Sequence, residues 1–153
     1  MTPVSGPLAI DYVSDINLGS HVLDGVTTTF RADKNDKTSG ASIAWHDLRG
    51  ANAGRYQITA QTKGITSAPG ATINFEGGEK YNISGHGADA TPFEASNIVL
   101  MNDNQPQKVI QGDGTISGYF ADIFNSVSMT IPVNQQTTGA QQVIITWNLT
   151  SAP

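Results

Sequence analysis

The chain has 153 residues, a length that suits one domain with a single core, and we expect residues 1–153 to form that domain. Its net charge is -5 and only 14% of its residues are charged, with the basic residues scattered singly between Arg31 and Lys108. This pattern offers no basic patch, which argues against nucleic acid as a partner and against charge capture by anionic polymers. Cysteine is absent, so disulfides and thiolate metal sites are excluded, although secretion is not.

Short strands joined by turns dominate the predicted secondary structure. The chain contains 16 glycines and 7 prolines, and Gly, Pro, Asn and Asp clusters separate most of its apolar segments. The predicted strands are 8–12, 27–31, 43–48, 55–61, 72–75, 97–101, 127–133 and 142–149. Such a series predicts a single all-β domain, an antiparallel β-sandwich or barrel-like domain with long Gly-rich loops.

The clearest alternation of apolar and polar residues covers 127–133, which predicts a half-buried antiparallel strand. Pro132 cannot donate a ladder hydrogen bond, so we expect this end of the strand at an edge or a bulge. A turn at 134–139 would then join it to the last strand as a hairpin. Two Gly-rich or polar stretches, 77–91 and 102–118, are predicted as surface excursions, where binding usually resides.

The last strand places a Trp-x-Leu triplet on one face. Val143, Ile145, Trp147 and Leu149 alternate with polar residues, so in an extended strand these four side chains point the same way. This alternation is equally compatible with core packing, which we favour, and with ligand contact by Trp147 and Leu149.

Signatures of catalysis or of metal binding are missing from the sequence. There is no phosphate-binding Gly-Lys-Ser/Thr loop, His-Glu-x-x-His or Gly-x-Ser-x-Gly. The three histidines, His21, His46 and His86, lie far apart and lack partners at metal-ligand spacing. The Asp- and Asn-containing stretches 33–36 and 102–104 lack the Gly and terminal Glu of an EF-hand loop. We therefore expect no metal, no cofactor and no enzyme, with a carbohydrate-active enzyme as the weakest alternative.

Several segments together resemble the WxL domain, a C-terminal cell-surface module of Gram-positive bacteria named for two Trp-x-Leu motifs. The ending Thr146-Trp147-Asn148-Leu149-Thr150-Ser151-Ala152-Pro153 matches most closely. Asp47-Leu48-Arg49-Gly50 followed by Ala53-Gly54 resembles the lead into the first motif, which is degenerate here as Tyr56-Gln57-Ile58. The opening, 6–12 and 16–20, is similar too, with Leu18 where the family usually has Phe.

The resemblance implies a secreted, non-catalytic module that attaches its parent protein non-covalently to the Gram-positive cell wall. It implies peptidoglycan and the ectodomain of a membrane-anchored WxL-interacting protein as partners. No apolar run approaches about 18 residues, so direct membrane insertion is not expected. A structural adhesin or pilus-type β-sandwich module is the alternative function. The candidate binding residues, which can also be structural, are Trp147, Leu149, Tyr56, Ile58, Asp47 and Arg49.

Two physical expectations accompany these residues. Tyr56 and Ile58 share one strand face, so both motifs can pack an aromatic-aliphatic pair on a common core, and we expect their strands to lie close together. Asp47 and Arg49 can form a local ion pair in a turn, or Arg49 can stack on the ring of Tyr56 or Trp147. If Trp147 is buried, the rings available for a glycan would be Trp45, Tyr119 and Phe120.

Overall fold

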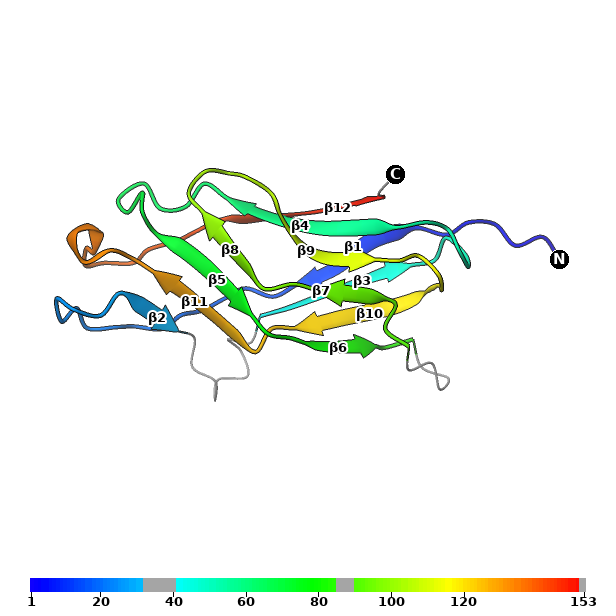
Figure 1. The fold of residues 1–153 in the computed structure, drawn as a ribbon, viewed down its shortest axis with the longest axis horizontal. Helices are drawn as coiled ribbons and strands as arrows, with labels where there is room; N and C mark the ends of the chain where they lie inside the picture. The colour runs from blue at the N-terminus through cyan, green and yellow to red at the C-terminus, as the bar shows by residue number, and fades with distance from the viewer. Residues whose placement is uncertain (32–40, 85–89, 152–153) are drawn as a thin grey trace.

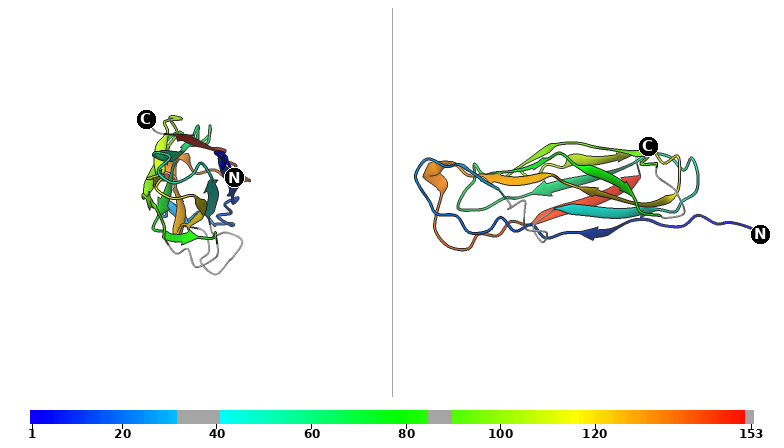
Figure 2. Two further views of the ribbon diagram at one scale, coloured as in Figure 1. Left: turned by 90° about the vertical axis from the view of Figure 1, so that its right-hand side faces the viewer. Right: turned by 90° about the horizontal axis from the view of Figure 1, so that it is seen from below.

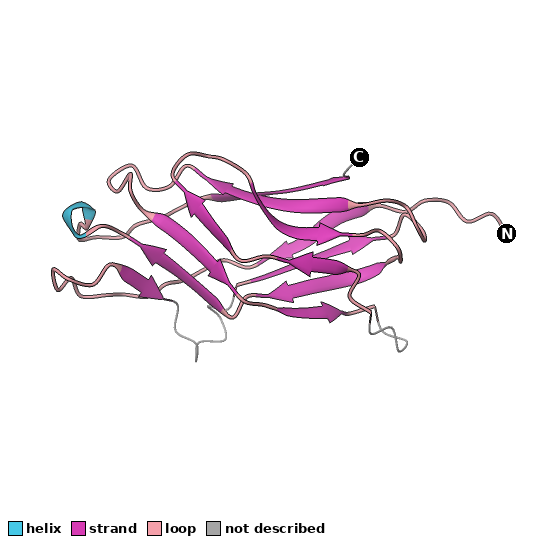
Figure 3. Ribbon diagram, in the orientation of Figure 1, coloured by secondary structure: helices cyan, strands magenta, loops and turns pink. Residues whose placement is uncertain are grey.

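The computed structural model describes residues 1–31, 41–84 and 90–151. This part of the chain forms twelve strands and one 3-10 turn, η1 (Val133–Gln135), with no α-helix (Figures 1 and 3). The strands make three four-stranded sheets in which all pairs are antiparallel, and none of these sheets closes on itself. The all-β prediction is therefore confirmed, with open sheets instead of a barrel. No described helix is long and apolar enough to cross a membrane.

Two of the sheets pack face to face. Sheet A has the order β1-β3-β10-β6 and sheet C the order β12-β4-β9-β7. Sheet A consists of β1 (Leu8–Val13), β3 (Ser42–Asp47), β10 (Gly118–Ile123) and β6 (Glu79–Asn82). Sheet C consists of β12 (Ile145–Ser151), β4 (Tyr56–Thr62), β9 (Gln107–Gly112) and β7 (Phe93–Ala95). Buried and less buried residues alternate along β3 and β4, as expected for strands with one face in a core.

Sheet B continues sheet A toward the other end of the elongated molecule (Figures 1 and 2). Its order is β2-β11-β5-β8, and its strands are β2 (Thr29–Arg31), β11 (Ser126–Thr130), β5 (Thr72–Glu76) and β8 (Ile98–Met101). Only Gly77 and Gly78 separate β5 from β6, and only Phe124 and Asn125 separate β10 from β11. The chain therefore passes between sheets A and B twice through a two-residue link, from β5 to β6 and from β10 to β11.

Three sequence expectations about local structure were wrong. The predicted excursion 102–118 contains β9, an inner strand of sheet C, and the predicted excursion 77–91 begins with β6. The alternation of β9 is broken by adjacent buried residues Val109 and Ile110, at an irregularity in the β4-β9 register, which hid the strand. The predicted terminal hairpin does not form: β11 pairs with β2 and β5, whereas β12 pairs with β4.

Aromatic side chains fill the space between sheets A and C. The ring of Trp45 lies 4.8 Å from that of Phe93, edge to face, and 6.2 Å from that of Phe120. Trp45 and Phe120 are both 0% exposed, so neither can offer a ring to a glycan, and that expectation was wrong for both. Of the three rings proposed, Tyr119 is the one that reaches the surface, at 42% exposure.

One buried carboxylate lies at the edge of this core. Asp122 of β10 is fully buried, and neither of its oxygens has a hydrogen-bond partner among the described residues. Burial raises the pKa of Asp122 to about 6, although Lys80, its neighbour across the β10-β6 ladder, favours the charged form. An uncompensated buried charge opposes folding whenever the group is ionised.

We expect stability to fall as the pH rises from about 4 to 6. Over this range the folded state holds the Asp122 proton more tightly than the unfolded chain does, so the protein loses free energy of unfolding as that proton leaves. Asp122→Asn removes the charge and should raise stability at pH 7.5 by roughly 2 kcal/mol while leaving it nearly unchanged at pH 4. Urea unfolding at both pH values measures this, and equal variant and wild-type stability at pH 7.5 would contradict it.

Candidate functional site

The two motif strands lie side by side at one edge of sheet C. β12 pairs antiparallel with β4, which places Leu149 opposite Ile58, Trp147 opposite Ala60 and Ser151 opposite Tyr56. The expectation that the strands lie close together is confirmed. The order of the sheet leaves the other side of β12 without a neighbouring strand among the described residues.

Trp147 and Leu149 are only half-buried. Both pack against the main core, and the Trp147 ring meets the Phe75 ring edge to face, with centroids 5.8 Å apart. By contrast, Tyr56 and Ile58 are almost completely buried. Trp147 and Leu149 are thus partly accessible to solvent at the edge of the sheet, while Tyr56 and Ile58 lie inside the core.

Tyr56 is held in the core by its hydroxyl group. The indole nitrogen of Trp45 donates a hydrogen bond of 2.8 Å to the Tyr56 hydroxyl, and both residues are buried. Burial raises the pKa of Tyr56 to about 12, so the phenol stays neutral at physiological pH. Through this hydrogen bond, Tyr56 of sheet C is linked to Trp45 of sheet A.

Asp47 and Arg49 form an ion pair next to the Tyr56 ring. The Asp47 carboxylate accepts hydrogen bonds from Arg49 Nε at 2.9 Å and from Nη2 at 3.1 Å. The guanidinium carbon lies 5.8 Å from the centroid of the Tyr56 ring, and Nη2 also donates to the Gly54 carbonyl at 2.6 Å. Hydrogen bonding to Asp47 raises the pKa of Arg49 above its usual value. The ion pair expected from the sequence is present, and the guanidinium lies within cation–π range of Tyr56, one of the two aromatic partners offered for stacking.

Arg49→Lys should lower the free energy of unfolding by about 1 to 2 kcal/mol. A lysine ammonium cannot donate through a planar fork to buried Asp47 and at the same time reach the Gly54 carbonyl beside the Tyr56 ring. Urea unfolding of this variant measures the effect. Arg55→Lys is the matched control, because Arg55 is exposed. Equal loss in both variants would remove the special role of Arg49.

Three exposed tyrosines lie on the outer face of sheet A, and two of them were missed from the sequence. In the register, Tyr12 of β1 pairs with Ala44, Ala44 with Ala121, and Ala121 with Tyr81 of β6. Tyr119 lies beside His46 in the neighbouring row. Tyr12 is 56% exposed and Tyr81 39%. We call Tyr12, Tyr81 and Tyr119, with the alanines between them, the tyrosine face.

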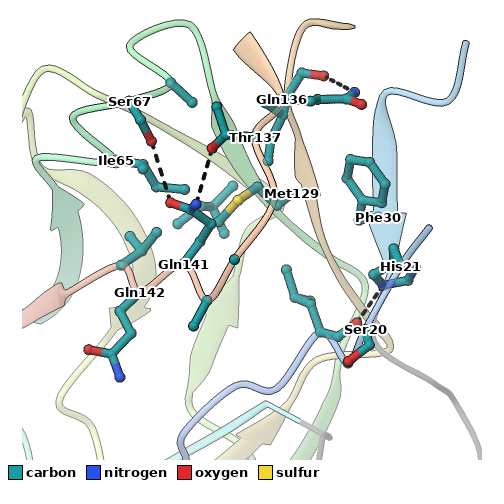
Figure 4. A pocket seen from close by; sticks show the side chains of 18 of the residues that line it. Ser20, His21, Phe30, Ile65, Ser67, Met129, Gln136, Thr137, Gln141 and Gln142 are labelled. Atoms are coloured by element: carbon teal, nitrogen blue, oxygen red, sulfur yellow. Dashed lines mark hydrogen bonds between the residues drawn. The ribbon is translucent and has the colours of Figure 1, made fainter. Parts of the chain in front are cut away.

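An open groove of about 740 Å³ lies at the sheet B end of the molecule (Figure 4). Its apolar lining includes Phe30, Ile65, Met129, Val143 and Ile145. Gln136, Gln141 and Gln142 also line it, and Gln141 is hydrogen-bonded to Ser67 and Thr137 (Figure 4). Because Val143 and Ile145 line the groove, it borders the start of β12.

Metal chemistry finds no support in the described residues. They contain no group of three or more His, Cys, Asp or Glu side chains that could hold a metal ion. Stretch 33–36 and His86 lie outside the described residues, so the expectations about them stay predictions.

The described residues form three open β-sheets whose motif residues pack in or against the core, with exposed rings and a groove at the surface. The family model described as WxL domain surface cell wall-binding matches residues 1–153. The chain therefore belongs to the WxL family, whose domains are non-catalytic surface modules that bind the cell wall non-covalently. It acts at the cell surface. No curated protein and no solved structure matches the chain.

Proposed function

We propose that the wall component bound by this domain is peptidoglycan, and that binding fixes the parent protein to the wall without a covalent bond. The observation that carries the proposal is the match of the cell wall-binding family model to the whole chain. The net charge of -5 supports peptidoglycan over the phosphate-rich polymers of the wall, because like charges repel.

Sedimentation with purified wall material tests this proposal. The 153-residue chain should be retained by sacculi stripped of their anionic polymers at least as well as by untreated walls. Loss of retention on stripping would assign binding to the anionic polymers and overturn the proposal.

A second partner, the ectodomain of a membrane-anchored WxL-interacting protein, is favoured by the free edge of β12. An edge strand can accept a strand from a partner through main-chain hydrogen bonds, with neighbouring pockets taking its side chains. The apolar groove continues from this edge through Val143 and Ile145, and Ile144 is 82% exposed. Strand addition along β12 would thus combine backbone pairing with apolar burial.

Charge placed at this edge tests the second partner. Ile144→Glu should weaken binding to the purified ectodomain, measured by biolayer interferometry, because a carboxylate would be desolvated in the contact. Val99→Glu, at an exposed site on β8, is the matched control. Equal binding by Ile144→Glu and wild type would overturn strand addition at β12.

A further inference from the structure

The tyrosine face has a regular layout that follows from the strand register. Tyr12 and Tyr81 occupy the two outermost strands of sheet A, three strand spacings apart, which is about 14 Å. The side chains between them on this row are Ala44 and Ala121, which are too small to cover the tyrosine rings. Tyr119 adds a third ring on the next row.

Neighbouring side chains hold two of these rings in place. The Tyr119 ring packs against the His46 ring with centroids 5.3 Å apart, and Asp11 lies 2.7 Å from His46 Nδ1. The Tyr81 hydroxyl donates a hydrogen bond to the Glu79 carboxylate. Rings that are ordered before binding lose less conformational freedom when a ligand arrives, so this arrangement favours affinity.

We propose that the tyrosine face is the glycan-binding surface of the domain, and that its ligand is the N-acetylated sugar chain of peptidoglycan. This inference rests on the proposed function and names the surface responsible for it. A pyranose ring has a C–H-rich face that suits the electron-rich face of an aromatic ring, and a rim of hydroxyl and acetamido groups. Tyrosine hydroxyls and the carboxylates of Asp11 and Glu79 supply hydrogen-bond partners for that rim.

The charges beside the tyrosine face favour this ligand over an anionic one. Asp11 and Glu79 are acidic, whereas Lys80 of the same strand reaches away to the Phe93 carbonyl oxygen at 3.4 Å and the Glu94 carboxylate at 4.0 Å. A phosphate polymer would meet repulsion here. A neutral sugar chain does not, and the amino groups of wall peptides would be attracted.

A triple variant, Tyr12→Ala/Tyr81→Ala/Tyr119→Ala, tests the proposal by sedimentation with sacculi stripped of anionic polymers. Each lost ring should weaken binding about two- to tenfold, so the triple variant should bind at least about tenfold more weakly. The corresponding triple Phe variant keeps the rings and should retain most of the affinity. Val99→Ala/Met101→Ala, at exposed apolar sites on β8, is the matched control and should bind as the wild type does.

Each outcome separates this proposal from the one on which it rests. If the wild type binds the stripped sacculi and the triple Ala variant does not, while their thermal unfolding is the same, the result supports the tyrosine face as the glycan-binding surface. Equal binding of both overturns the tyrosine face and leaves peptidoglycan as the ligand at another surface. Absence of wild-type binding overturns both proposals. Loss of binding to the partner ectodomain, with peptidoglycan binding intact, would overturn the glycan assignment and make this face a protein contact.

Nuclear magnetic resonance of the wild type gives an independent readout. Titration with soluble oligomers of N-acetylglucosamine should shift the backbone amide signals of Ala44 and Ala121, while those of β12 stay in place. Shifts confined to β12 or to the groove would overturn the proposal.

Discussion

Gly112→Ala should lower the free energy of unfolding by about 3 to 5 kcal/mol. A Cβ at position 112 would lie 2.0 Å from the ring of Tyr56, its partner across the β4-β9 ladder. The ring cannot move aside cheaply, because Trp45 donates to its hydroxyl and Arg49 lies near its face. Overpacking and the loss of a buried hydrogen bond therefore add together. A small domain has only about 5 to 15 kcal/mol in total, so this loss is a large share of its stability.

Urea unfolding followed by circular dichroism measures this loss. Gly19→Ala is the control: its φ of 73° is unfavourable for alanine, a backbone cost that Gly112 does not carry, but nothing lies within 4 Å of the added Cβ. This control should lose only about 1 to 2 kcal/mol from the backbone. A Gly112 variant that is no less stable than the Gly19 variant would contradict the register between β4 and β9.

Trp147→Ala should lower the free energy of unfolding by about 3 kcal/mol. Complete burial of a tryptophan gives losses of about 3 to 5 kcal/mol on truncation, and Trp147 is only half-buried, so its loss lies at the lower end. The contact with Phe75 disappears with the ring. Thr146→Ala, an exposed neighbour on the same strand, should stay within about 0.5 kcal/mol of the wild type.

Wall binding by the Trp147 variant separates packing from ligand contact. Measured well below its melting temperature, the folded fraction should bind peptidoglycan as the wild type does, because the rings proposed to meet the glycan lie on sheet A. Trp147→Phe should recover most of the stability. A Trp147→Phe protein as stable as the wild type that fails to bind would instead make the indole a ligand contact.

The sequence predicted the strand class well where a strand has one clear face, and poorly elsewhere. Residues 43–48 and 55–61 alternate cleanly, and β3 and β4 lie there within a residue or two. β9 was missed because Val109 and Ile110 are both buried next to each other, which resembles neither a one-sided strand nor a helix. The hairpin of β12 with β11 was predicted from a local turn signal and is wrong, whereas the closeness of β12 to β4 was predicted from the matching faces of their two motifs.

The candidate site divides in the same way. The proximity of Asp47, Arg49 and Tyr56 was within reach of sequence reasoning, because Asp47 and Arg49 lie two residues apart, shortly before the strand that begins at Tyr56. The tyrosine face was not, since Tyr12, Tyr119 and Tyr81 come from three strands far apart in the chain. Trp45 was offered as an exposed ring, although its neighbours Ile43 and Asp47 on the same strand face are buried with it.

The two tryptophans experience different surroundings, and this gives the domain two optical reporters. Trp45 is sealed in the core beside Phe93 and donates to Tyr56, so its emission should change only when sheets A and C separate. Trp147 is half-buried on an edge strand, so a dissolved quencher such as iodide reaches it more readily than Trp45. Quenching that is lost on adding a partner would report occupation of that edge while the fold stays intact.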